Sequence, residues 1–246
     1  MPKTIIIIPS RIAASRLPRK PLLKINNLAM ISHVVKKAQE ARIGEVYVAT
    51  DDQEISNEVK SIGGTAILTS AHHKTGTDRI FECYKKLKLF DVEYIINLQG
   101  DEPLIDKKEI RNLNNLMIKK KADFGTLASK IKDNKIYLNE NIVKVITKKE
   151  LSKNNFSVAL DFVRINKSKK KSNIYHHIGM YAYKTKILEK FVNLKQTKNE
   201  IRNRLEQLRA LDNKIKISVT LAKTSPIGVD TKEDYIAIKK IMEYKS

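Results

Sequence analysis

Residues 3–22, KTIIIIPSRIAASRLPRKPL, contain the feature that decides the fold. The four consecutive isoleucines at positions 5–8 are too few for a helix and apolar on both faces, which is typical of a strand buried in the centre of a sheet. We expect Pro9 to end this strand. Because ligands bind at the carboxyl ends of the strands in open α/β sheets, the loop that follows is the first candidate for a binding site.

This loop is strongly basic, with cations at Arg11, Arg16, Arg19 and Lys20. A solvated surface loop is the ordinary interpretation of such a segment. Arginine pairs with phosphate oxygens in a bidentate manner, however, and lysine supplies a point charge. The glycine-rich alternatives GxxxxGK[ST] and GxGxxG do not occur in the chain. The loop therefore predicts a phosphate site built mainly from side chains.

The remaining sequence predicts alternating strands and helices, followed by a β-rich region. Apolar spacing predicts helices at residues 29–41, 53–62, 107–120 and 232–244. Strands are expected at residues 45–49, 65–68, 94–98, 124–129, 143–147, 157–163, 179–183 and 216–221. This order predicts an α/β fold with a doubly wound, mostly parallel but mixed sheet, Rossmann-like, with a β-rich insertion.

Two carboxylates are candidate ligands of Mg²⁺. Asp101 follows a predicted inner strand, and Gly100 before it permits close approach of the backbone. Asp230 precedes Thr231, which reads with Asp234 as a helix capping box. Asp230 is therefore either a ligand or part of a helix start.

Residues 72–79, HHKTGTDR, are the next candidate site. Small hydroxyl residues and Gly76 before a helix let backbone N–H groups approach a ligand, although Thr77 or Asp78 is equally suited to cap the helix. Adjacent histidines point apart and no third ligand is near, so we do not expect a metal at His72 and His73.

Composition limits the choice of function classes. The chain has 246 residues, enough for one domain, and a net charge of +21. Its 48 basic residues are mostly lysines spread along the chain, without a nucleic-acid-binding motif, so we expect weak binding to polyanions and no specific nucleic-acid site. Cys83 is the only cysteine, so an intramolecular disulfide is excluded, and its helical neighbours place it in the core. The sequence shows neither a signal peptide nor a membrane span, from which we expect a cytoplasmic protein.

Several segments resemble, in the same order, the motifs of the 3-deoxy-manno-octulosonate (Kdo) cytidylyltransferases, the CMP-Kdo synthetase family. They are SRIAASRLPRKPL (10–22), HKTGTDR (73–79), QGDEP (99–103), HHIGMYAY (176–183), LEQLRAL (205–211) and GVDT (228–231). The resemblance implies a nucleotidyltransferase that converts CTP and Kdo to CMP-Kdo and pyrophosphate for lipopolysaccharide biosynthesis. It also implies a homodimer and a single nucleotidyltransferase domain. Within that domain, residues 1–130 and 215–246 would bind nucleotide, and residues 131–214 would bind sugar and dimerise.

The resemblance also implies roles for individual residues. The nucleotide-binding residues would be Pro9, Ser10, Arg11, Arg16, Lys20, Thr75, Gly76, Thr77 and Gln99. The sugar-binding residues would be Gln99, Arg164, His177, Tyr181 and Glu206. Lys20, Asp101 and Asp230 would be catalytic, the two aspartates as ligands of Mg²⁺.

The resemblance fails around Arg164. The family typically has Tyr-Phe-Ser-Arg followed by a Pro-Ile-Pro turn, whereas this chain has Asp161-Phe162-Val163-Arg164 and no proline after it. Two alternatives stay open, and only the first follows from this departure. One is an enzyme for another acidic sugar, such as 8-amino-Kdo or another ulosonate. The other, suggested only by the net charge, is a basic nucleic-acid-binding protein.

Overall fold

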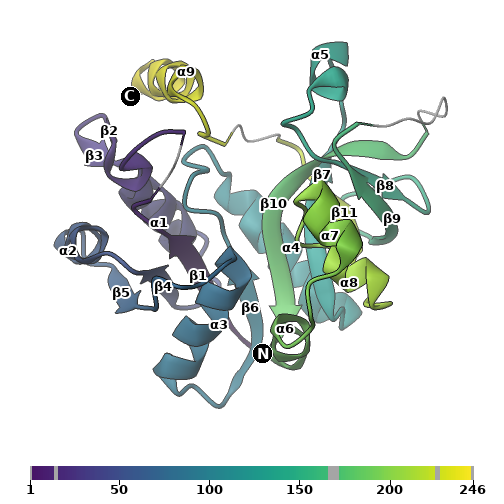
Figure 1. The fold of residues 1–246 in the computed structure, drawn as a ribbon, viewed down its shortest axis with the longest axis horizontal. Helices are drawn as coiled ribbons and strands as arrows, with labels where there is room; N and C mark the ends of the chain where they lie inside the picture. Colours follow the sequence, from purple (N-terminus) through teal and green to yellow (C-terminus); the bar gives the residue numbers. More distant parts are fainter. Residues whose placement is uncertain (1, 14–15, 166–171, 225–227, 245–246) are drawn as a thin grey trace. The chain divides into compact units, whose positions relative to one another are not determined.

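The computed structural model describes residues 2–13, 16–165, 172–224 and 228–244. Their contacts divide the chain into unit 1, Met1–Arg111 with Pro226–Ser246, and unit 2, Asn112–Ser225 (Figure 1). The sequence placed residues 112–130 and 215–225 with the nucleotide-binding part. Contacts group them with unit 2 instead, because the strands in these two segments pair with strands of the β-rich region. A single functional domain stays a prediction.

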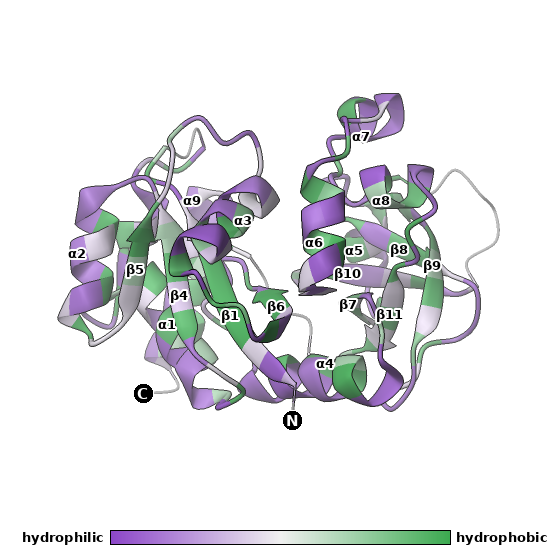
Figure 2. Ribbon diagram, turned by 90° about the horizontal axis from the view of Figure 1, so that it is seen from below, coloured by the Kyte–Doolittle hydropathy of each residue, from purple (hydrophilic) through white to green (hydrophobic). Residues whose placement is uncertain are grey.

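Unit 1 is built on four parallel strands. Their order is β5 (Thr65–Leu68), β4 (Val46–Thr50), β1 (Lys3–Ser10) and β6 (Val92–Asn97). All four isoleucines of β1 are fully buried, and the strand is strongly hydrophobic in Figure 2. The predicted central strand is therefore confirmed.

The prediction that Pro9 ends β1 is wrong, because pairing with β4 continues through Pro9 and Ser10. The amide of Ile6 donates to the carbonyl of Glu45, which precedes β4, so the amide positions of alternate residues face β4. The backbone nitrogen of Pro9, which carries no hydrogen, therefore faces β6. On that side the pairing of β1 with β6 has already ended at Ile7 and Asn97. A proline at such a position removes no ladder hydrogen bond.

The helices of unit 1 define where its strands reverse order. Helices α1 (Met30–Glu40) and α2 (Gln53–Ser61) connect β1, β4 and β5 in one direction across the sheet. Helix α3 (Gly76–Leu87) then leads back to β6, on the other side of β1. Right-handed connections place α3 on the face opposite α1 and α2. The carboxyl ends of β1 and β6 therefore form a topological switch point, where ligands bind in such sheets.

Shorter elements complete unit 1. The 3-10 helix η1 (Lys20–Leu22) and the hairpin of β2 (Lys24–Ile25) and β3 (Leu28–Ala29) connect β1 to α1. Helix α9 (Lys232–Glu243) begins with the predicted capping box of Thr231 and Asp234. Cys83 of α3 is fully buried, as predicted. Among the described residues, no helix is long and apolar enough to cross a membrane.

In the described part of unit 2, five strands pair in a closed order. Strands β10 (Ile174–Lys184), β7 (Phe124–Ser129), β11 (Ser218–Leu221), β9 (Ser157–Val163) and β8 (Lys144–Thr147) follow one another, and β8 also pairs with β10. Only β7 and β11 are parallel to each other; the other pairs are antiparallel. Its helices are α4 (Lys107–Lys120), which begins in unit 1, α5 (Asn134–Leu138), α6 (Thr185–Val192), α7 (Lys198–Asn203) and α8 (Leu208–Asp212). Phe124, Tyr183 and Phe191 pack together in its core.

Candidate active site

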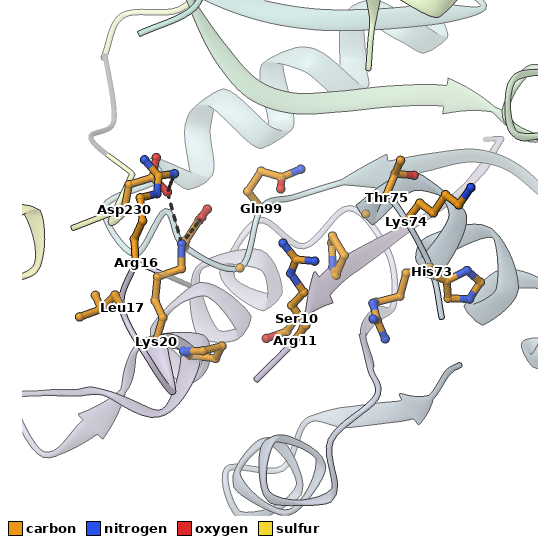
Figure 3. Close-up of a pocket in the computed structure, with 16 residues that line it drawn as sticks. Ser10, Arg11, Arg16, Leu17, Lys20, His73, Lys74, Thr75, Gln99 and Asp230 are labelled. Carbon is orange, nitrogen blue, oxygen red and sulfur yellow. Dashed lines mark hydrogen bonds and ion pairs between the residues drawn. The ribbon is translucent and has the colours of Figure 1, made fainter. Parts of the chain in front are cut away.

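A pocket of about 310 Å³ lies at the carboxyl ends of β1 and β6 in unit 1. Figure 3 shows Arg16, Lys20 and Asp230 on one side, His73, Lys74 and Thr75 on the other, and Ser10, Arg11 and Gln99 between them. The pocket thus occupies the switch point of the sheet. Its two sides differ in chemistry, because one combines cations with carboxylates and the other is a loop before a helix.

The floor of the pocket depends on close packing of two strand ends. A Cβ added to Gly100 would lie 3.1 Å from the carbonyl oxygen of Pro9 and 3.2 Å from Ile31 Cδ1, so the predicted need for glycine here has a steric basis. The hydroxyl of Ser10 is buried and has no hydrogen-bond partner among the described residues. A buried hydroxyl of this kind is expected to bond to a water or ligand.

Lys20 joins the two predicted metal ligands on the first side. Its Nζ lies 2.7 Å from Asp101 Oδ2 and 3.6 Å from Asp230 Oδ1, and it donates to the carbonyl oxygen of Val229 at 2.7 Å (Figure 3). Arg16 Nη2 lies 3.1 Å from Asp230 Oδ1. Two cations and two carboxylates that are distant in sequence therefore meet at one place.

Backbone contacts hold this cluster in position. The amide of Val229 donates to the carbonyl of Asp101 at 2.9 Å, which fixes the segment before α9 against the end of β6. Asp234 of the capping box accepts from the amide of Asp230. Arg19, in contrast, adopts a left-handed conformation and pairs with Glu54 of α2, so its charge is directed away from the cluster.

The second side of the pocket is the 70–75 loop, residues 70–75 between β5 and α3. Thr75 caps α3 by accepting from the amide of Asp78 at 3.1 Å, and Thr75 and Gly76, at the start of the helix, line the pocket. A Cβ added to Gly76 would lie 3.4 Å from Pro9 Cγ, so this turn packs directly on the end of β1. Positively polarised amides at a helix start favour an anionic or strongly polar ligand.

Arg79 anchors the helix that follows this loop. Its guanidinium donates to Thr69 Oγ1 at 2.7 Å and to Asp51 Oδ2 at 2.9 Å, and its side chain is only 4% exposed. The pairing ties α3 to the carboxyl ends of β4 and β5. Arg79, His73 and Lys74 belong to the candidate segment 72–79 but were not named among the predicted nucleotide-binding residues, although all three line the pocket. The signal was available, since they belong to the same HKTGTDR motif as Thr75.

The two aspartates suit a divalent cation. Mg²⁺ is commonly held by one or two protein carboxylates, with waters and substrate phosphates completing its shell. The ammonium of Lys20 within 4 Å of both carboxylates marks this place as one that attracts a cation. No group of three or more His, Cys, Asp or Glu side chains within the described ranges is arranged to hold a metal alone. The site therefore fits an ion that arrives with a phosphate ligand.

The pocket contains the predicted nucleotide-binding residues except Thr77. Thr77 is buried in the first turn of α3 and does not line the pocket. Asp101 and Asp230 also line the pocket. Their binding roles stay predictions.

The other predicted sugar-binding residues lie in unit 2. Arg164 follows β9, and its guanidinium donates to backbone carbonyls of Asn203, Arg204 and Glu140 at 3.2–3.4 Å. Lys144 donates at 2.7 Å to the carbonyl of Arg164, and burial together with that guanidinium lowers the lysine's pKa. In this structure Arg164 thus ties three chain segments together.

His177 and Tyr181 are neighbours on β10, with ring centroids 5.3 Å apart. A β-bulge separates them, and the hydroxyl of Thr126 contacts both His177 Nε2 at 3.0 Å and the carbonyl of Met180 at 2.8 Å. Burial lowers the pKa of His177 to about 3, so its imidazole is neutral. Glu206 lies beside Arg209, which forms a bidentate pair with Glu200.

Comparisons with known proteins agree along nearly the whole chain. A profile of the family described as cytidylyltransferase matches residues 5–217. The chain is 43% identical to the 3-deoxy-manno-octulosonate cytidylyltransferase of Afipia carboxidovorans, covering 97% of this chain and 96% of the relative. Identity is also 43% to the protein of the same name from Thermodesulfovibrio yellowstonii, covering 97% and 98%.

Solved structures give the same result for the fold. CMP:2-keto-3-deoxy-manno-octonic acid synthetase, solved in complex with CTP, superposes with a TM-score of 0.89 at 32% identity, over 99% of this chain and all of that one. UDP-glucose pyrophosphorylase in complex with UDP-glucose superposes with a TM-score of 0.70 at 17% identity, covering both chains completely. The fold is therefore the mixed α/β fold of the nucleotidyltransferases, as predicted.

Proposed function

Because this chain belongs to the cytidylyltransferase family and its relatives named above are Kdo cytidylyltransferases, we propose that it transfers the cytidylyl group of CTP to 3-deoxy-D-manno-octulosonate. The products are CMP-Kdo and pyrophosphate. The observation that carries the proposal is the meeting of Arg16, Lys20, Asp101 and Asp230 in one pocket at the switch point of the sheet. Such a cluster can neutralise a triphosphate and hold the ion that accompanies it.

In the reaction the anomeric hydroxyl of the sugar attacks the α-phosphorus of CTP in line, and pyrophosphate leaves. Little covalent chemistry is required of the protein, so positioning and charge neutralisation account for most of the rate. Lys20 and Arg16 stabilise the negative charge that accumulates on the phosphates. The 70–75 loop contacts the nucleoside end, because His73 and Thr75 lie across the pocket from Arg16, Lys20 and the two carboxylates (Figure 3). Gln99 lies between the two sides, where the reacting groups meet.

We propose Asp101 and Asp230 as the residues that hold Mg²⁺. The ion supplies Lewis-acid activation of the α-phosphate when it is bound. Asp101 reaches the pocket from the end of β6 and Asp230 from the segment before α9. Together they would supply two protein ligands, and waters and phosphate oxygens of CTP would complete the shell.

For the sugar we propose Gln99, Arg164, His177, Tyr181 and Glu206 as the binding residues. The support is the motif resemblance together with the neighbouring positions of His177 and Tyr181 on β10. The neutral imidazole of His177 serves as a hydrogen-bonding group and not as a cation. A second substrate, another ulosonate such as 8-amino-Kdo, is favoured by one observation: Arg164, in a loop without the family's prolines, binds backbone carbonyls.

The wider setting follows from the substrates. We propose a cytoplasmic homodimer that acts in lipopolysaccharide biosynthesis, since CTP is a cytoplasmic metabolite and Kdo is a lipopolysaccharide sugar. The nucleic-acid alternative rests on net charge alone, whereas the pocket and the relatives support an enzyme of small substrates.

The proposal is tested by incubating the protein with CTP, Mg²⁺ and a panel of ulosonic acids while pyrophosphate release is followed. We expect release with Kdo and CTP, none without Mg²⁺, and little with UTP or ATP. A higher kcat/KM for an amino sugar than for Kdo would support the second substrate. Absence of turnover with every sugar, in protein that is folded by circular dichroism, would contradict the proposed reaction.

A further inference from the structure

Glu82 of α3 receives hydrogen bonds from the loop that forms one side of the nucleotide pocket. Its Oε2 accepts from the amide of Ser70 at 2.9 Å and contacts Nε2 of His73, and Lys86 Nζ lies 2.7 Å from its other oxygen. Burial alone would raise the pKa of Glu82. The hydrogen bonds from Lys86, Ser70 and His73 outweigh this effect and lower the pKa to about 2. The carboxylate is therefore charged at neutral pH.

Residues of α3 hold the 70–75 loop and the residue before it at three points, and the amide of that residue, Thr69, also donates to the carbonyl of Thr50 at 2.8 Å. Arg79 binds Thr69 just before the loop, and Thr75 at its end caps the helix. Glu82 supplies the third point, through the amide of Ser70 at the start of the loop and the ring of His73. Between these points the loop presents His73, Lys74 and Thr75 to the pocket (Figure 3). Among the described residues, the hydrogen bond with Glu82 is the one that the structure gives for the His73 side chain. Removing Glu82 would therefore leave this imidazole without it.

We propose that Glu82 is a positioning residue for nucleotide binding, which acts through Ser70 and His73 by fixing the 70–75 loop against α3. The inference rests on the proposed function, because it assumes that this loop contacts the nucleotide. Glu82 itself does not line the pocket. Its effect therefore comes from preorganisation: a loop that is already in its bound conformation loses less conformational entropy when the ligand binds.

A purely structural role for Glu82 makes a different prediction. A carboxylate that only stabilised α3 would act through Lys86, four residues further along the same helix. Removing Lys86 would then resemble removing Glu82. In the positioning role the contacts that Glu82 makes with Ser70 and His73 matter. Lys86 contacts neither of them: its Nζ donates to the carbonyl of Leu68 at 2.8 Å, before the loop, and its side chain is half exposed, so its removal should leave the two loop contacts in place.

The test compares wild-type protein with Glu82→Ala, Glu82→Gln and the matched control Lys86→Met. CTP dissociation constants are measured by calorimetry at a temperature where circular dichroism shows every variant folded, and ¹⁵N spectra follow the Ser70 amide and the His73 ring. We expect Glu82→Ala to weaken CTP binding about 10-fold or more, because two hydrogen bonds to a charged group are lost. Glu82→Gln keeps an acceptor for Ser70, so it should recover part of that loss. Lys86→Met should bind CTP like the wild type.

The spectra give a readout that does not depend on turnover. In Glu82→Ala the Ser70 and His73 signals should shift, in Glu82→Gln mainly those of His73, and in Lys86→Met neither. CTP affinity within twofold of wild type in Glu82→Ala, or an equal loss in Lys86→Met, would overturn the positioning role and leave the proposed function intact. If wild-type protein fails to bind CTP, both are overturned.

Discussion

Among single residues, Lys20 contacts both of the proposed metal ligands. Its side chain is 15% exposed, and its ammonium group lies beside Asp101, Asp230 and the carbonyl of Val229. Charged partners offset the cost of removing the amine from water. Lys20 is therefore placed both to keep the carboxylates together and to meet a phosphate.

Lys20→Ala and Arg16→Ala should each lower kcat/KM by about 10-fold to 1,000-fold, because each removes a charge-assisted contact of about 1.5–3 kcal/mol or more. Steady-state kinetics with CTP as the varied substrate checks this. Arg19→Ala is the matched control, since Arg19 belongs to the same basic loop but pairs with Glu54. Its kinetics should remain close to those of the wild type, and an equal loss in all three would point to a general charge effect.

Asp101→Asn and Asp230→Asn should each abolish most turnover, and the double variant should be little worse than either. Residues that act as a unit are strongly non-additive, and these two share Lys20 in the structure. Single-turnover formation of CMP-sugar measures the effect, and Mn²⁺ binding in the presence of CTP reports the metal site directly. Near-normal turnover in Asp230→Asn with reduced thermal stability would show that this residue only supports the start of α9.

The residue types of the pocket were predictable from sequence, but their partners were not. The sequence predicted Lys20 from the basic loop after the first strand, and Gly100 and Asp101 from their place after a predicted inner strand. All three line the pocket. The direction of Arg19 toward α2 depends on its left-handed backbone, which no spacing rule predicts. Likewise, the carbonyls that bind Arg164 come from segments about 20 and 40 residues away, and only the folded chain brings them together.

At the scale of elements, helix caps provide a test that separates stability from catalysis. Asp52 caps α2 by accepting from the amides of Glu54 and Ile55 at 2.8 and 3.0 Å, and it does not line the pocket. Asp52→Ala should lower the free energy of unfolding by about 0.5–2 kcal/mol and leave kcat unchanged. Urea denaturation and steady-state assays on the same sample measure both. A fall in kcat without loss of stability would assign Asp52 a role in the reaction.

The bounds of most predicted elements agree with the structure to within one or two residues: helices α1, α2 and α9 are each shorter than predicted by one residue at one or both ends. Helix α4 and strands β7 and β9 have the predicted bounds. Strand β10 begins at Ile174, five residues before its predicted start, because pairing with β8 extends it. The β2–β3 hairpin was missed because each strand has two residues, and its turn depends on the positive φ of Asn26 and Asn27.

For the whole molecule, the buried imidazole of His177 makes stability depend on pH. Burial lowers its pKa from 6.5 to about 3 in the folded protein, so between these values the unfolded chain binds the extra proton. Stability from this residue is complete above pH 6.5 and falls as the pH decreases toward 3, at up to about 1.4 kcal/mol per pH unit. His177→Gln should reduce the slope of unfolding free energy against pH between 4 and 6. An unchanged slope would show that other groups cause it.

The buried thiol of Cys83 can report how often α3 opens. Burial, with the nearby charge of Glu82, raises its pKa to about 12, and a reagent can attack only the thiolate of an exposed cysteine. Cys83 is the only cysteine and lies on α3. The rate at which a disulfide reagent modifies it should therefore measure how often this helix, which carries Arg79 and Glu82, opens. Added CTP should slow the reaction in proportion to pocket occupancy, whereas Kdo alone should not. A rate equal to that of a free thiol would contradict the buried position.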